Sequence, residues 1–123
     1  MTVTDREPPM PYVPEDAATF ERIQAELQTA ARVLDGLAPA VSVFGSARTA
    51  SDSWEGQTAH RVGHLLGLAG VPVVTGGGPG VMGAANRGAH EAGGDSVGLN
   101  IQLPMEQHAN AYINRHVSFR YFL

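Results

Sequence analysis

Apolar residues recur along the chain at helical spacing in three stretches. The clearest is Phe20, Ile23 and Leu27, which lie three and four residues apart and continue in register to Leu34. Such spacing places apolar side chains on one face of a helix, which can pack against a sheet or a partner subunit. Glycine or proline follows each stretch and ends it. The pattern predicts helices over residues 15–35, 54–69 and from the glycine-rich segment near residue 80 to residue 92.

Three shorter runs, at residues 40–44, 71–75 and 96–101, are largely apolar instead of alternating. Such runs are typical of strands in a parallel sheet that is covered on both faces. They alternate with the predicted helices, which is the order of right-handed β-α-β crossovers. The sequence therefore predicts an α/β fold, a Rossmann-like parallel sheet with helices on both faces, of which three strands are visible. Residues 105–115 are predicted to be helical, and residues 118–123 begin another apolar segment.

The remaining N-terminal residues, 1–14, include four prolines and are predicted to be a flexible, extended leader. Residues 15–123 are predicted to be the N-terminal part of one Rossmann-like nucleotide-binding domain. The length of 123 residues suits one domain, and an apolar share of 43% is enough for a core.

Composition excludes several kinds of chemistry. The net charge of −4 argues against a nucleic-acid surface. All eight basic residues are arginines, so neither a pyridoxal Schiff base nor a Walker A lysine is possible within these residues. The absence of cysteine excludes disulfides and zinc-thiolate sites. Neither a signal peptide nor a membrane-spanning run is visible, so a cytoplasmic protein is expected.

The strongest local signal for a ligand is the segment Thr75–Gly83, which holds five glycines between a predicted strand and a predicted helix. Its last six residues match G-x-G-x-x-G. Glycines let a phosphate approach backbone N–H groups, and a helix N-terminus favours negative charge. A dinucleotide is disfavoured, because the following strand ends in Asn100 without a carboxylate and the turn follows the second strand instead of the first. A mononucleotide or a sugar phosphate fits better.

Two further segments follow strands and so belong to the same edge of the sheet. After the first strand, Ser46 can donate a hydrogen bond and Arg48 can pair with a phosphate, although Arg48 could equally be a solvated loop charge. After the third strand, Glu106 could accept hydrogen bonds from sugar hydroxyls or could simply begin a helix. His60 and His64 lie four residues apart, a spacing that can bind metal, but no third ligand is nearby and a surface role is preferred.

Three segments, at residues 43–48, 74–89 and 98–107, together resemble the LOG (Lonely Guy) family, whose members were often labelled lysine decarboxylases. The resemblance covers roughly residues 20–123. It implies a phosphoribohydrolase, which cleaves a cytokinin riboside 5′-monophosphate or AMP into the free base and ribose 5-phosphate. The resemblance implies substrate-binding roles for Gly45, Ser46 and Arg48 as pocket residues, Gly77, Gly78 and Gly80 as the first glycine loop, Met82 as a wall of the base pocket, and Glu106 as a carboxylate for the substrate.

The family's second signature, P-G-G-x-G-T-x-x-E, and the Arg-Lys pair before it are absent. The catalytic Arg and Glu are therefore expected beyond Leu123, and the isolated chain is expected to be inactive. The resemblance implies no cofactor and no metal. It implies a nucleoside monophosphate as substrate and a homodimer when the protein is full-length. A non-catalytic nucleotide-binding or carrier module stays open as the alternative, and a dinucleotide-dependent oxidoreductase is disfavoured.

Overall fold

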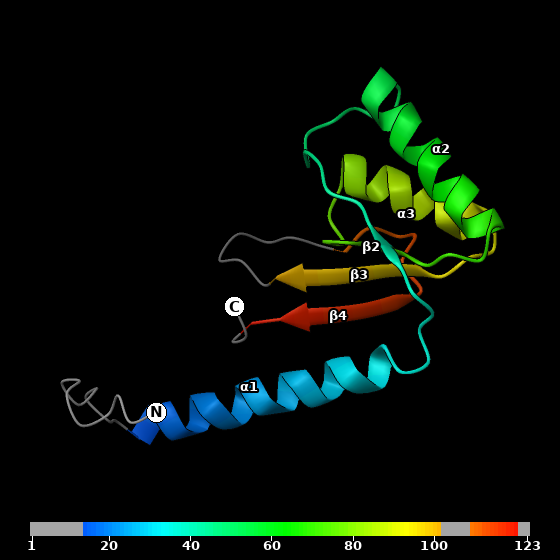
Figure 1. Ribbon diagram of the computed structural model, residues 1–123. Helices are drawn as coiled ribbons and strands as arrows, with labels where there is room; N and C mark the ends of the chain where they lie inside the picture. Colours follow the sequence, from blue (N-terminus) through cyan, green and yellow to red (C-terminus); the bar gives the residue numbers. More distant parts are fainter. Residues whose placement is uncertain (1–13, 102–108, 121–123) are drawn as a thin grey trace, which may run out of the picture.

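The computed structural model describes residues 14–101 and 109–120. Residues 1–13 of the predicted leader and Glu106 lie outside these ranges, and Pro14, the last residue of that predicted leader, begins a helix. In chain order the elements, drawn in Figure 1, are α1 (Pro14–Val33), β1 (Val41–Ser42), α2 (Trp54–Leu68), β2 (Val73–Thr75), α3 (Val81–Glu91), β3 (Ser96–Ile101) and β4 (Arg115–Phe119).

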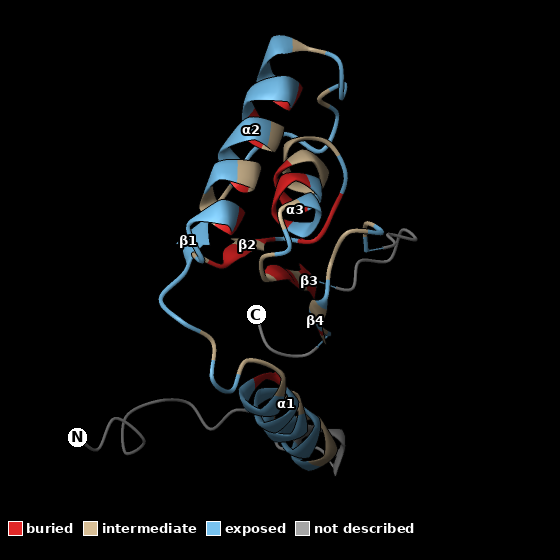
Figure 2. Ribbon diagram, turned by 90° about the vertical axis from the view of Figure 1, so that its right-hand side faces the viewer, coloured by how far each residue is buried: buried red, intermediate tan, exposed pale blue. Residues whose placement is uncertain are grey.

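The strands form one parallel sheet in the order β1-β2-β3-β4. Helices α2 and α3 cover one face of this sheet, and α1 lies on the other side next to β4 (Figures 1 and 2). The predicted fold class is confirmed. Because every strand runs the same way, the segments after β1, β2 and β3 all emerge at one edge of the sheet.

Strand β4 corrects the sequence analysis, which saw three strands and predicted a helix over residues 105–115. Within the described part of that range, residues 109–114 contain a turn and no helix, and the strand begins at Arg115. Five residue pairs join β4 to β3, from Val97↔Arg115 to Ile101↔Phe119. Before the strand, the backbone N–H groups of Asn110 and Asn114 donate to the carbonyl oxygens of Gly77 and Ser96, both at 2.8 Å, and these long-range bonds take the place of helical ones.

The core lies between the sheet and α3, around the buried side chains of Val73, Ala85 and Ala89. Helix α2 packs on α3 at backbone distance, because glycines line the contact. A Cβ at Gly63 would overlap the carbonyl oxygen of Ala85, and one at Gly88 would overlap the carbonyl oxygen of His60. The pair of helices is therefore locked in one position over β2 and β3, which fixes where α3 begins.

The opposite face of the sheet is only partly covered. Helix α1 packs against β4, where Arg115 Nη1 donates to the carbonyl oxygens of Val33 and Asp35 at 3.0 and 2.9 Å. Nearer to β1, the side chain of Phe44 is 85% exposed and Ile101 is also exposed. Between them is a hollow of about 240 Å³ that is lined mainly by apolar residues.

Candidate functional site

The glycine-rich turn between β2 and α3 has a backbone that only glycine adopts readily. Gly77 and Gly80 have φ angles of +80° and +72°. The N–H of Gly77 donates to Thr75 Oγ1 at 2.9 Å, and the Thr75 hydroxyl in turn donates to Asn86 Oδ1 at 2.5 Å. The turn is therefore tied to α3 from inside the protein.

Asn86 is the buried centre of the network behind the turn. Its side chain is fully buried, and its Nδ2 donates to Ser96 Oγ at 2.9 Å and to the Val97 carbonyl at 3.3 Å. Its Oδ1 accepts from both Thr75 and Asn110. From the sequence, Asn86 could have been either a cap or a pocket residue, whereas the structure shows that it joins β2, α3 and β3.

Asn110 holds the turn from the other side. Its backbone N–H donates to the Gly77 carbonyl at 2.8 Å, and its Nδ2 donates to the Gly78 carbonyl at 3.0 Å. A trans peptide points its N–H and C=O in opposite directions. Since the carbonyl of the Gly77–Gly78 peptide faces Asn110, the N–H of Gly78 faces away from it. The turn thus has two acceptors bonded to Asn110 and one donor, the Gly78 N–H, on the opposite side of the peptide.

Helix α3 adds further donors at its N-terminus. The N-cap residue is Gly80, and no side chain caps the helix. The N–H of Val81 is taken by the Ser46 carbonyl at 3.0 Å, and that of Ala84 by Gly80. Within the described residues, no acceptor pairs with the N–H groups of Met82 and Gly83. An uncapped helix start with free N–H groups favours an anion.

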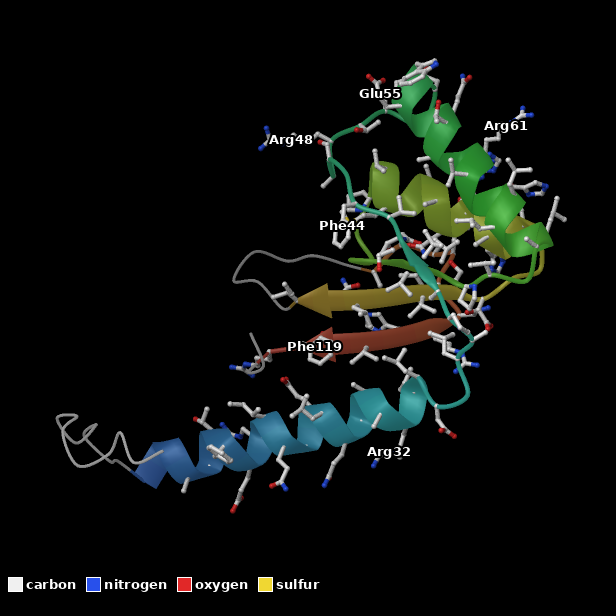
Figure 3. All side chains as sticks on the ribbon, viewed as in Figure 1. Arg32, Phe44, Arg48, Glu55, Arg61 and Phe119 are labelled. Atoms are coloured by element: carbon white, nitrogen blue, oxygen red, sulfur yellow. The ribbon has the colours of Figure 1, made fainter. Side chains whose placement is uncertain are left out.

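The loop after β1 lies directly against this helix start. A Cβ at Gly45 would come within 2.5 Å of the Val81 side chain, and one at Gly80 would overlap the Ser46 carbonyl oxygen. The side chain of Ser46 accepts the N–H of Arg48 at 3.1 Å. The Arg48 side chain is exposed and extends away from the loop (Figure 3). The structure therefore brings Gly45 and Ser46 to the turn, and leaves the Arg48 guanidinium in solvent.

Met82 and Asn100 also touch the turn, but only Met82 was predicted from the sequence to belong to the site. Met82 was predicted, and its Cε and Sδ are the nearest atoms to the positions that Cβ atoms would take at Gly78 and Gly76. Asn100 at the end of β3 was noted only for lacking a carboxylate, but it is buried and its Oδ1 packs where a Gly77 side chain would lie. That oxygen has no hydrogen-bond partner among the described residues.

The histidines on α2 do not form a metal centre within the ranges that the structure describes. His60 and His64 stack with ring centroids 6.3 Å apart, and His60 Nε2 is 2.7 Å from Glu91 Oε1 on α3. Among the described residues, no group of three or more His, Cys, Asp or Glu side chains could hold a metal ion. Likewise, no helix in these ranges is both long and apolar enough to cross a membrane.

Comparison with known proteins identifies the family. The family model of SLOG cluster4 matches residues 38–119, which include β1 to β4 and the whole turn. The chain belongs to the SLOG cluster4 family. The match supports the resemblance to LOG at the level of the SLOG and LOG-like superfamily.

Two solved structures resemble this SLOG chain. The molybdenum cofactor carrier protein from Chlamydomonas reinhardtii is 30% identical with a TM-score of 0.53, over 66% of this chain and 49% of that one. The protein TM1055 is 31% identical with a TM-score of 0.50, over 65% of this chain and 45% of that one. The SLOG chain thus spans about half the length of either structure. No curated protein matches the sequence.

Proposed function

We propose that the turn between β2 and α3 binds a nucleoside 5′-monophosphate. The observation that carries the proposal is the direction of the backbone donors. Asn110 takes the carbonyl oxygens of Gly77 and Gly78, and the Gly78 N–H points away from Asn110. Among the described residues, no acceptor takes the N–H groups of Met82 and Gly83 at the start of α3. Backbone N–H groups at a helix N-terminus are the donors that bind phosphate in many α/β proteins.

The proposed activity of the whole protein is hydrolysis of the N-glycosidic bond of that nucleotide, giving the free base and ribose 5-phosphate. Support comes from the order of three motifs that resemble LOG and from membership of the SLOG cluster4 family. In this proposal Gly45, Ser46, Gly77, Gly78 and Gly80 shape the ligand edge. Met82 borders the base, as in the resemblance. Glu106 contacts the nucleotide, Arg48 turns from solvent toward it when it binds, and two copies of the full-length protein associate.

A second candidate function is the binding and delivery of a phosphorylated ligand without catalysis. It is favoured by the similarity to the molybdenum cofactor carrier protein, which is 30% identical over two thirds of this chain. A carrier needs the backbone donors of the turn but no group that attacks a glycosidic bond.

The two functions differ in what happens to the bound molecule. Incubating the full-length protein with AMP should release adenine and ribose 5-phosphate if it is a hydrolase, and chromatography separates both products from AMP. A carrier would bind a phosphorylated ligand and return it unchanged. Tight binding of AMP with no adenine after many hours would reject hydrolysis of AMP and favour the carrier.

Gly78→Val tests the turn itself. Gly78 does not have a positive φ, and the nearest atom to a new Cβ is the flexible end of Met82 at 2.9 Å, so the variant should fold. The branched side chain would stand where the backbone must approach a phosphate. We expect AMP affinity to fall roughly tenfold or more, with an unchanged circular dichroism spectrum. Unchanged affinity in a folded variant would remove the turn from the site.

A further inference from the structure

A groove of about 1000 Å³ runs between α2 and α3 on the side of the helices that faces solvent. One end lies at Gly80 and Gly83, and the other lies at His60 and Glu91. Seven residues of helix separate Gly80 from Arg87, which is about 10 Å. This distance along the helix is longer than a single phosphate group, so a phosphate that sits on the turn does not fill the far half of the groove.

The far half contains a bridge of three side chains. Glu91 accepts from His60 Nε2 at 2.7 Å through one oxygen, and from Arg87 Nε at 2.9 Å through the other. The hydrogen bond from His60, followed by that from Arg87, holds the pKa of Glu91 below its usual range, and Glu91 in turn raises the pKa of Arg87. Both oxygens of the carboxylate are thus already used, and the side chains of His60 and Arg87 are both held in place.

Most hydrogen-bonding atoms of this half that have no partner among the described residues are donors. Only Nε of Arg87 is bonded, so its two terminal nitrogens have no acceptor among the described residues. Arg61 lines the same groove from α2, and its side chain stands exposed on that helix (Figure 3). His64 also lines it, and its Nδ1 is buried without a partner in the described ranges.

We propose that this half of the groove is a second binding site, for a phosphate group, with Arg87 and Arg61 as its charged contacts. Two guanidinium groups offer paired N–H donors that match the oxygens of a phosphate. Glu91 is a positioning residue, which holds the guanidinium group of Arg87 in the groove. The side chains of Arg87 and Glu91 are 49% and 41% exposed, so their ion pair adds little to stability and leaves the fork accessible. The site does not depend on the function proposed for the turn.

The test uses inorganic phosphate, pyrophosphate and ribose 5-phosphate as probes of the full-length protein. Backbone NMR spectra should shift at residues 57–65 and 84–91 on titration, and calorimetry gives the affinities. Arg87→Gln should weaken binding roughly tenfold, because it removes a charge-assisted pair of hydrogen bonds. Arg32→Gln is the matched control, since it removes the same charge from α1, where the only side-chain hydrogen bond of Arg32 within the described residues is to Thr29.

The outcomes separate this site from the turn. Binding of any of the three probes at the groove, lost in Arg87→Gln but kept in Arg32→Gln and Gly78→Val, supports the proposal. Binding of pyrophosphate or phosphate alone would point to a free anion, and tighter binding of ribose 5-phosphate to a phosphorylated metabolite. Equal affinities in Arg87→Gln and Arg32→Gln, or shifts confined to residues 76–83, would overturn it whether or not AMP is hydrolysed.

Discussion

At the scale of single residues, two asparagines account for the shape of the turn. Asn86 lies inside the protein with both ends of its amide bonded, and Asn110 reaches the turn from the connection between β3 and β4. Neither could be assigned from the sequence. The two positions are 24 residues apart, and an amide carries no period that reveals its partner. The glycines of the turn, by contrast, were visible because positive φ angles and close approach leave few other choices.

Replacing Asn86 should show how much its side chain contributes to the free energy of unfolding. In Asn86→Ala, the Thr75 hydroxyl loses its acceptor, while Ser96 Oγ and Asn110 Nδ2 each lose one hydrogen bond and keep another. We expect a loss of about 2 to 4 kcal/mol in the free energy of unfolding, measured by urea denaturation. Gln57→Ala is the control, because it removes an exposed amide that, within the described residues, donates to the Asp52 carbonyl alone, and should cost less than about 0.5 kcal/mol. Equal losses in the two variants would contradict a central role for Asn86.

At the scale of elements, the helices and the first three strands were predictable because their patterns are local. Continuous apolar runs marked β1 to β3, and glycine marked the end of each helix. Strand β4 was missed, since Arg115, His116 and Ser118 interrupt any apolar run and the pairing with β3 decides its structure. The close contact of α2 with α3 was also not visible, because glycines in a helix give no sign of what they touch.

A matched pair of glycines on α3 tests that contact. A Cβ at Gly88 would overlap the His60 carbonyl oxygen and lie 2.6 Å from the backbone nitrogen of His64. A Cβ at Gly83 would have no neighbouring atom closer than 3.4 Å. Gly88→Ala should therefore destabilise the protein by about 1 to 3 kcal/mol. Gly83→Ala should be neutral or stabilise it by up to about 1 kcal/mol, because alanine favours a helix. Thermal unfolding of both variants gives the comparison, and a reversed order would show that the two helices are not locked at Gly88.

The Glu91 bridge between α2 and α3 predicts a pH dependence. The pKa of Glu91 is lowered in the folded protein, first by the hydrogen bond from His60 and then by that from Arg87. A lowered pKa means that the bridge stabilises the folded state above the ordinary pKa of a glutamate, and that this contribution is lost as the pH falls through the lowered value. Glu91→Gln should thus melt below the wild type near neutral pH, and the two melting temperatures should converge in acid. A difference that persists at the lowest pH would assign it to packing instead of charge.

At the scale of the whole molecule, the sheet has one well covered face and one that is partly open. Phe44 and Ile101 are exposed on the open face and line the same hollow. Exposed apolar patches on a sheet promote association. Replacing Phe44 and Ile101 together with serine and threonine should keep the chain monomeric at concentrations where the wild-type chain self-associates. Sedimentation velocity measures this, and identical self-association of the two chains would mean that another surface is responsible.

The two hydrogen bonds from Asn110 to the turn also decide when the turn can take its final shape during folding. Strands β2 and β3 pair across α3, from Val73↔Ser96 to Thr75↔Gly98, and this pairing needs neither β4 nor Asn110. The turn itself cannot reach its final shape at that stage, because two of its carbonyl oxygens are held by a residue more than 30 positions later. Only when β4 docks on β3 does Asn110 arrive. We therefore expect the turn to lose its shape whenever β4 detaches from β3.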